Sequence, residues 1–304
     1  KSASHYFQAV PFLRSALRVI RLIMLPVALG FLVYFAYGAR EVLGDVLERA
    51  SARHLLLSLI LWASAHFIFP AFSATFLDRK HNRVSYCVML RIHAKNLPAR
   101  YIPGGVWHTI GRFVDLRHRG MTSRRLSALM FMENSLLASV ALGVGGASVW
   151  YSRGFGGWGS IGAVGALTGL ASLVLSPIIV NRWILNNQDR ILLALYAKCI
   201  AVLVIFWAFA AAAFVSYLNA FAGGLQPMHW LQTGGIYLLS WGLGFVAFFA
   251  PQGIGVFEVT LANLLPATYS LGAVAVLIGG FRIVIMAADA LVWLIARFAF
   301  PRAG

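Results

Sequence analysis

The sequence predicts an all-α polytopic membrane protein, one membrane domain over residues 1–304 with about seven to eight transmembrane helices. Three observations predict this class. Hydrophobic residues make up 60% of the chain and charged residues 11%, whereas about a quarter of a soluble domain is charged. The apolar residues fall in blocks of roughly 20, the helix length that crosses a bilayer core of about 30 Å. The alternation of outer-membrane strands is absent, so the blocks are expected to be helices.

The long apolar blocks share this length and lie between short polar segments. They are 19–38, 54–77, 126–150, 160–181, 191–222, 231–250 and 272–297. A shorter apolar stretch at 254–268 follows a Pro-Gly break. If it crosses the membrane, the chain makes eight crossings. If it only dips in as a re-entrant segment, the chain makes seven and the C-terminus lies on the opposite side.

The distribution of basic residues predicts the orientation. Of the 25 Lys and Arg residues, 11 lie between Arg79 and Arg125, and Arg14, Arg18 and Arg21 stand at the start of the first span. Short basic segments stay on the cytoplasmic side of a membrane. We therefore expect a multi-pass protein of a bacterial-type inner membrane, with a cytoplasmic N-terminus.

The net charge of +16 has the same explanation. Most of the excess charge lies at predicted cytoplasmic membrane edges, where each basic residue gains about 1 kcal/mol from anionic headgroups. We therefore expect no nucleic-acid partner. The two Cys residues and the His residues form no metal-binding pattern, so neither a metal nor another cofactor is expected.

The motifs of common membrane enzymes are missing from the sequence. It has no His-Glu-x-x-His zinc site, no Gly-x-x-x-x-Gly-Lys-Ser/Thr loop and no Gly-x-Ser-x-Gly elbow. It also lacks the Asp-x-Asp pair of many glycosyltransferases. Together these gaps favour a protein that binds or moves a molecule over an enzyme.

Two helix-breaking stretches interrupt the apolar pattern, YIPGGVWHTIGR at 101–112 and PQGIGVFE at 251–258. Both contain Pro-x-Gly-aliphatic, and their prolines lie 148 residues apart. This spacing predicts an internal repeat with halves 1–152 and 153–304, either parallel or inverted, and one broken helix in each. Matched breaks in two halves indicate a transporter binding site, because a helix that restarts after a break offers free N–H groups to an anion. The alternative is that both breaks are interfacial turns.

Charged residues inside apolar segments are candidates for the same site. Glu258, Arg282, Asp289 and Glu133 each interrupt an apolar stretch, and such a group is costly in a membrane unless it is paired or hydrated. Arg282 with Glu258 or Asp289 could form a structural ion pair. Alternatively, Arg282 and Arg112 neutralise an anionic headgroup while Glu258 shapes the site or carries a proton.

The two broken stretches also resemble the lysylphosphatidylglycerol synthase transmembrane-region family, which includes the flippase half of the multiple peptide resistance factor. Pro103, Gly104, Gly105, Trp107 and Arg112 match its first motif. The second motif is matched by Gly253, Gly255 and Glu258, while Gln252 replaces a usual Gly and Phe257 a basic residue. The resemblance implies lipid translocation. It does not imply synthase activity, because no aminoacyl-transferase domain follows the spans.

The sequence therefore predicts a flippase or lipid transporter, not an enzyme, with a polar cavity between the two broken helices. The expected partner is an anionic membrane lipid, either a phospholipid or an isoprenoid phosphate, and a lipid-modifying enzyme is a further candidate. Two alternatives stay open: an enzyme acting on lipid-linked sugars with His108 or Glu258 as general base, and a non-transporting scaffold. The residues expected to bind the lipid are Pro103, Gly104, Gly105, Trp107, His108, Arg112, Pro251, Gly253, Gly255, Glu258 and Arg282.

Overall fold

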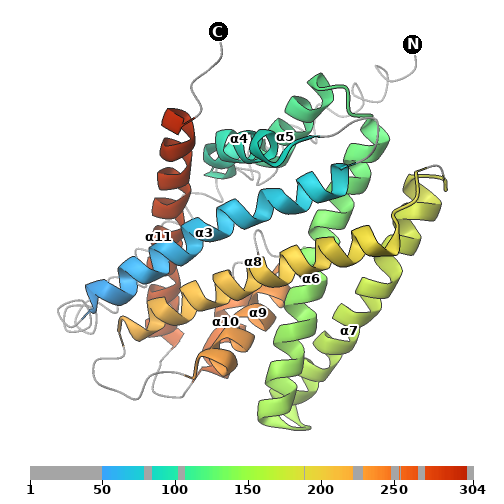
Figure 1. Ribbon diagram of the computed structural model, residues 1–304. Helices are drawn as coiled ribbons and strands as arrows, with labels where there is room; N and C mark the ends of the chain where they lie inside the picture. Colours follow the sequence, from blue (N-terminus) through green and yellow to red (C-terminus); the bar gives the residue numbers. More distant parts are fainter. Residues whose placement is uncertain are drawn as a thin grey trace, which may run out of the picture.

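The structure is a computed structural model in which every regular element of the described residues is a helix (Figure 1). The described residues are 50–78, 84–101, 107–187, 189–221, 229–247, 253, 255–265 and 271–299. The predicted span 19–38 lies outside them, as do the motif residues Pro103, Gly104, Gly105 and Pro251.

The elements have the following bounds in chain order. They are α3 (Ala52–Leu77), α4 (Tyr86–Asn96), η2 (Leu97–Tyr101), α5 (Trp107–His118), α6 (Ser123–Arg153), α7 (Gly157–Ile179), η3 (Val180–Ile184), α8 (Leu193–Asn219), α9 (Trp230–Val246), α10 (Val256–Leu264) and α11 (Leu271–Ala299).

Five helices of the described chain are long and apolar enough to cross a membrane. They are α3, α6, α7 with the π-helical turn η3, α8, and α11. Their existence confirms the predicted helices at 54–77, 126–150, 160–181, 191–222 and 272–297. Much of their surface faces outward, since 22% of the most apolar window of α7 and 33% of that of α11 is buried. An apolar surface of this extent is suited to lipid, so the chain is a multi-pass membrane protein.

The remaining two predicted segments form shorter helices. The segment 231–250 forms α9, with 17 residues, and the stretch 254–268 contains α10, with nine. At 1.5 Å per residue α10 is about 14 Å long, less than half of a bilayer core. It is therefore too short to cross the membrane as a helix by itself.

Two pairs of short helices fold back on themselves. In the first hairpin (α4, η2 and α5), Lys95 donates a hydrogen bond of 2.8 Å to Asp115, and Asn96 donates one of 3.0 Å to the other oxygen of the same carboxylate. In the second hairpin (α9 and α10), the ring centroids of Tyr237 and Phe257 lie 6.0 Å apart. Gly253 packs tightly against Gly244 of α9, since a Cβ atom on Gly253 would lie 2.7 Å from the carbonyl oxygen of Gly244. The residues between the arms of each hairpin include a Pro-Gly break of the sequence.

The order of long and short helices occurs twice. In chain order α3, α4, α5 and α6 have 26, 11, 12 and 31 residues, and α8, α9, α10 and α11 have 27, 17, 9 and 29. Their contacts also correspond: α3 packs on α4 as α8 packs on α9, and α6 packs on α9 as α11 packs on α4. The two sets of four helices thus correspond in order and in contacts, with α7 between them.

Helices that correspond run in opposite directions. The first turn of α3 lies beside the last turn of α8, where Ser58 donates to the carbonyl of Ala213 and Ser216 to that of His54. In Figure 1, α6 runs downward and α11 upward. Corresponding helices of the two sets are therefore antiparallel.

Close contact between α6 and α9 depends on glycine. A Cβ atom on Gly145 would lie 2.3 Å from the backbone nitrogen of Leu239 and 2.8 Å from the carbonyl oxygen of Gly235. A Cβ on Gly143, on the same helix, would meet no atom within 4 Å. Small residues at such interfaces let the two backbones approach, which is how helices associate in lipid.

We expect Gly145→Ala to destabilise the protein by about 1–3 kcal/mol, because the added methyl group has no space and overpacking carries costs of that size. Gly143→Ala is the matched control and is expected to be neutral or slightly stabilising, since alanine favours helix. Thermal unfolding in detergent measures both. Equal unfolding temperatures for the two variants would contradict this packing.

Candidate functional site

The central polar cluster consists of His66, His93, Arg100, Tyr101 and Asp289. These residues come from α3, α4, η2 and α11, and the carboxylate of Asp289 lies at their centre. Its side chain is 2% exposed. Arg100 approaches one oxygen of this carboxylate at 3.0 Å, and Tyr101 donates a hydrogen bond of 2.8 Å to the same oxygen. The last residues of the first hairpin before its Pro-Gly break are thus tied to α11.

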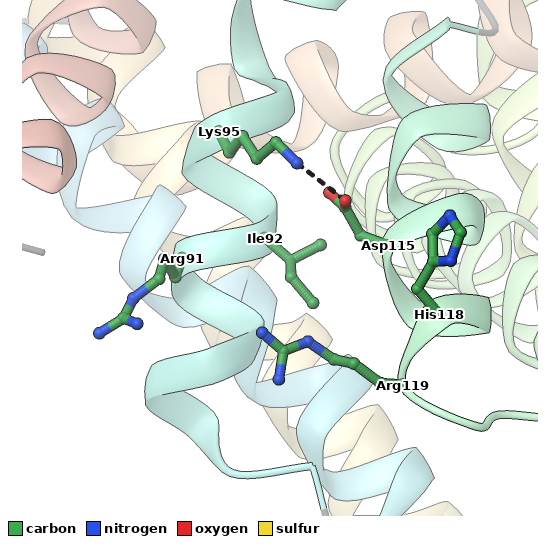
Figure 2. A pocket seen from close by; sticks show the side chains of 6 residues that line it. All are labelled: Arg91, Ile92, Lys95, Asp115, His118 and Arg119. Carbon is green, nitrogen blue, oxygen red and sulfur yellow. Dashed lines mark hydrogen bonds and ion pairs between the residues drawn. The ribbon is translucent and has the colours of Figure 1, made fainter. Parts of the chain in front are cut away.

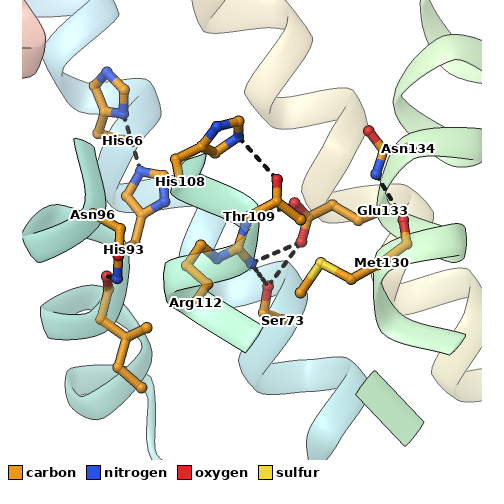
Figure 3. A network of polar contacts seen from close by, with 11 residues as sticks. His66, Ser73, His93, Asn96, His108, Thr109, Arg112, Met130, Glu133 and Asn134 are labelled. Carbon is orange, nitrogen blue, oxygen red and sulfur yellow. Dashed lines mark hydrogen bonds and ion pairs between the residues drawn. The ribbon is translucent and has the colours of Figure 1, made fainter. Parts of the chain in front are cut away.

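The other oxygen of Asp289 faces a pair of histidines. His66 Nε2 lies 2.6 Å from Asp289 Oδ1, a contact that is close but not aligned as a hydrogen bond. On its other side His66 Nδ1 lies 3.1 Å from His93 Nε2 (Figure 3). His66 is therefore held between a carboxylate and a second imidazole. Burial, followed by the charges of His66 and neighbouring arginines, lowers the pKa of His93 well below its usual range, so His93 is neutral at physiological pH.

A second buried group joins α5 to α6 beside this cluster. The guanidinium of Arg112 donates to both oxygens of Glu133 at 2.7 and 2.8 Å, and to Ser73 of α3 at 2.9 Å (Figure 3). The side chains of Arg112 and Glu133 are 2% and 7% exposed. Both terminal nitrogens of the predicted headgroup ligand Arg112 are therefore occupied within the protein. A bidentate, buried pair of this kind fixes the position of α5.

His108 and Trp107 begin α5, next to the unassigned segment 102–106. His108 Nε2 lies 3.2 Å from the hydroxyl of Thr109, and its buried Nδ1 has no hydrogen-bond partner among the described residues. Burial, together with the positive charges of Arg100 and Arg112, lowers the pKa of His108 to about 4. His108 is thus neutral, with one ring nitrogen still able to bind a polar group. Trp107 is 40% exposed.

The second hairpin contributes an ion pair between α10 and α11. Glu258 accepts a hydrogen bond of 2.8 Å from Arg282 on one oxygen and one of 2.6 Å from the backbone N–H of Gly255 on the other. Of the two partners predicted for Arg282, the structure gives Glu258. Gly253 and Gly255 have φ angles of +70° and +92°, which favour glycine. The anion that the start of α10 binds is its own Glu258, while Arg282 keeps 37% of its side chain exposed.

A basic pocket of about 270 Å³ lies between the arms of the first hairpin (Figure 2). Figure 2 shows the Lys95–Asp115 ion pair across one side of it and Arg119 extending from α5 toward α4 on the other. Ile92 lies between them. The lining residues are Arg91, Ile92, Lys95, Asp115, His118 and Arg119. The single acid among these lining residues, Asp115, is paired with Lys95, and Arg91 and Arg119 make the pocket positive.

The sequence had pointed to some of these residues but not to others. Arg100 and Tyr101 adjoin the first Pro-Gly break, and their nearness to it was the available signal. His66 is an ionisable residue within a predicted span, a pattern that already indicates function. The contact of Asp289 with Arg100 joins residues 189 positions apart, which no local pattern reveals.

Neither a metal site in the described residues nor a known relative indicates the function of this cluster. In the described ranges, no three or more His, Cys, Asp and Glu side chains are placed to hold a metal ion. Comparison with known proteins finds no matching family model and no matching curated protein. The resemblance to the lysylphosphatidylglycerol synthase transmembrane-region family therefore stays a prediction.

Separating the Arg112–Glu133 pair is expected to be strongly destabilising. Arg112→Gln or Glu133→Gln leaves one buried charge without its partner, which costs about 3–5 kcal/mol. The double variant is expected to lose less than the sum of the two, because no lone charge is left. Lys95→Gln, in an ion pair whose lysine is 67% exposed, is the control and is expected to change stability by less than about 1 kcal/mol. Additive losses in thermal unfolding would contradict the pairing.

Acid is expected to destabilise the protein through His108. The folded protein keeps this imidazole neutral to a pKa of about 4, whereas the unfolded chain protonates it near pH 6.5. The contribution is therefore complete above about pH 6.5 and is lost as the pH falls toward 4, by about 2 kcal/mol between pH 7.5 and 5. His108→Gln should remove that part of the acid sensitivity, and the exposed His229→Gln should not. An unchanged acid response in His108→Gln would contradict this assignment.

Proposed function

We propose that the protein moves an anionic amphipathic lipid between the leaflets of a bacterial-type inner membrane. The observation that carries this proposal is the meeting of both hairpins with the middle of α11. Arg282 and Asp289 lie on either side of the midpoint of its apolar stretch, Val274–Ala299. Seven residues separate them, which is about 10 Å along a helix. The second hairpin binds the first of these residues and the first hairpin binds the other.

The two hairpins approach α11 from opposite sides. The first hairpin follows α3 in the chain and the second follows α8, and these two apolar helices are antiparallel. If both cross the bilayer, their C-terminal ends lie on opposite faces, and so do the bases of the hairpins. Two re-entrant segments that meet near the midplane within an inverted repeat are the arrangement of many secondary transporters. This is the support for a translocation pathway.

A polar group at this depth is tolerated where it faces protein or a water-filled cavity. Arg100 and Arg282 have 37% of their side chains exposed, in contrast to 2% for Arg112. We therefore assign the neutralisation of the headgroup phosphate to Arg100 and Arg282. The Arg112–Glu133 pair anchors α5 to α6. Glu258 orients Arg282 and satisfies the start of α10.

The orientation follows from the same arrangement. The basic residues of the first hairpin favour the cytoplasmic side, which is also the side of the N-terminus if residues 19–38 cross. With α9 and α10 as a hairpin that does not cross, α11 ends on the cytoplasmic side. Arg297 then lies on the cytoplasmic side, as expected for a basic residue, even though 254–268 does not cross the membrane. The basic pocket between α4 and α5 would gather anionic headgroups from that leaflet.

The test is a leaflet-exchange assay in liposomes that contain the purified protein. We expect labelled phosphatidylglycerol or a polyprenyl phosphate to cross faster than in protein-free liposomes, and phosphatidylcholine not to. Arg100→Gln and Arg282→Gln should each slow exchange about tenfold, because a hydrogen bond to a charged group contributes about 1.5–3 kcal/mol.

Arg297→Gln is the matched control on α11, since Arg297 stacks on Trp293 at the end of that helix, away from both hairpins. It should exchange lipid at the wild-type rate. If no anionic lipid crosses faster than in protein-free liposomes, translocation is refuted. Recovery of a covalently altered lipid would favour the enzyme alternative in its place.

A further inference from the structure

The histidine pair beside Asp289 has the geometry of a proton-binding site. His66 uses both ring nitrogens, with Nε2 at 2.6 Å from Asp289 Oδ1 and Nδ1 at 3.1 Å from His93 Nε2. An imidazolium has two N–H donors, one for each of these neighbours. A neutral His66 has one N–H, and the second contact then needs a proton on His93 Nε2. A protonated His66 is therefore accommodated by the Asp289 carboxylate beside one ring nitrogen and by His93 beside the other.

The state of His93 is compatible with this. Its low pKa keeps the ring neutral, and with the ring proton on Nδ1 its Nε2 can accept from a protonated His66. The charged or titratable groups facing this site, element by element, are His93 of α4, Arg100 and Tyr101 of η2, His108 and Arg112 of α5, Glu133 of α6 and Asp289 of α11. Glu133 is already neutralised by Arg112. The carboxylate left to balance a charge on His66 is Asp289.

Asp289 has a competing cationic partner. Arg100 binds it at 3.0 Å from the side opposite His66, and Arg100 also stands at the end of the first hairpin with 37% of its side chain exposed. One carboxylate thus faces two cations when His66 is protonated. A proton on His66 neutralises Asp289 and weakens its hold on Arg100, which then has a positive charge to offer to another anion.

We propose that His66 binds the proton that accompanies an anionic headgroup, and that its protonation frees Arg100 from Asp289 to bind the headgroup phosphodiester. This inference rests on the proposed function for the identity of the ligand. A proton and a phosphodiester together add no net charge to the site, whereas the phosphodiester alone would bring an uncompensated charge into a poorly solvated region. Binding of headgroup and proton are then linked, and each raises the affinity for the other.

The linkage is tested in detergent with water-soluble, short-chain phosphatidylglycerol. We expect its apparent affinity to rise as the pH falls, by up to tenfold per pH unit, with uptake of up to one proton per bound lipid. A pH indicator in weakly buffered solution measures the proton uptake. Addition of short-chain phosphatidylcholine should cause no proton uptake by the protein. Inorganic phosphate should bind at least tenfold more weakly, and equal binding would identify a free phosphate as the ligand and overturn the headgroup assignment.

Three variants distinguish the roles. His66→Gln should bind phosphatidylglycerol weakly at every pH, because Arg100 stays with Asp289. Asp289→Asn should bind it tightly at every pH, because Arg100 is released permanently. The double variant should behave like Asp289→Asn, and its tight binding would show that the His66→Gln substitution does not unfold the protein. His54→Gln is the matched control on α3, near its start and hydrogen-bonded to Ser51, and should keep the wild-type pH dependence.

Several results separate this inference from the proposed function. A wild-type pH dependence in His66→Gln, or weak binding by Asp289→Asn at high pH, would overturn the inference. Lipid exchange between leaflets by the wild-type protein would be unaffected by that result, so the proposed function would stand. Proton-linked binding with no lipid exchange by the wild-type protein in liposomes would instead overturn translocation and leave the linkage intact.

Discussion

Asp289 is a carboxylate in the middle of an apolar helix, and much of the arrangement around it follows from its need for partners. A charged group at this depth is stable only when other groups replace the water that it has lost. Arg100, Tyr101 and His66 do so from two other elements. To reach Asp289, the end of the first hairpin must lie against α11, and α4 must bring His93 against α3. The position of η2 against α11 is therefore tied to one buried charge.

Two other ion pairs each join a short helix to the long helix that follows it, and the positions of cation and anion are exchanged between them. In the first, the short helix α5 supplies the cation Arg112 and the long helix α6 the anion Glu133. In the second, α10 supplies the anion Glu258 and α11 the cation Arg282. The first pair is sealed and the second is partly exposed. One ion pair is thus an internal anchor, and the other holds an accessible cation.

The sequence predicted the long helices well, because an apolar block of membrane length has few other stable structures. It also indicated the Arg282–Glu258 pair, since both residues interrupt nearby apolar segments. The sequence predicts 231–250 as a span and leaves open whether 254–268 crosses the membrane, so it allows seven or eight crossings. In the structure they contribute the two arms of one hairpin, and that depends on the contact of Gly244 with Gly253. The partners of Arg112 and Asp289 were not predictable, because tertiary packing brings together residues from different helices.

The residue before Glu258 shows how the two hairpins differ in chemistry. Phe257 stands where the resembled family often has a basic residue, and its ring lies 6.0 Å from that of Tyr237 while its Cβ atom faces Gly244. An aromatic contact here closes the second hairpin with apolar packing and leaves Arg282 as the cation of its ion pair. The first hairpin, in contrast, carries Arg100 near α11 and the basic pocket between its arms. An anion would therefore find most of the positive charge along the first hairpin, whereas the exposed cation beside the second hairpin is Arg282 of α11. The two sides of the proposed pathway are thus electrostatically unequal.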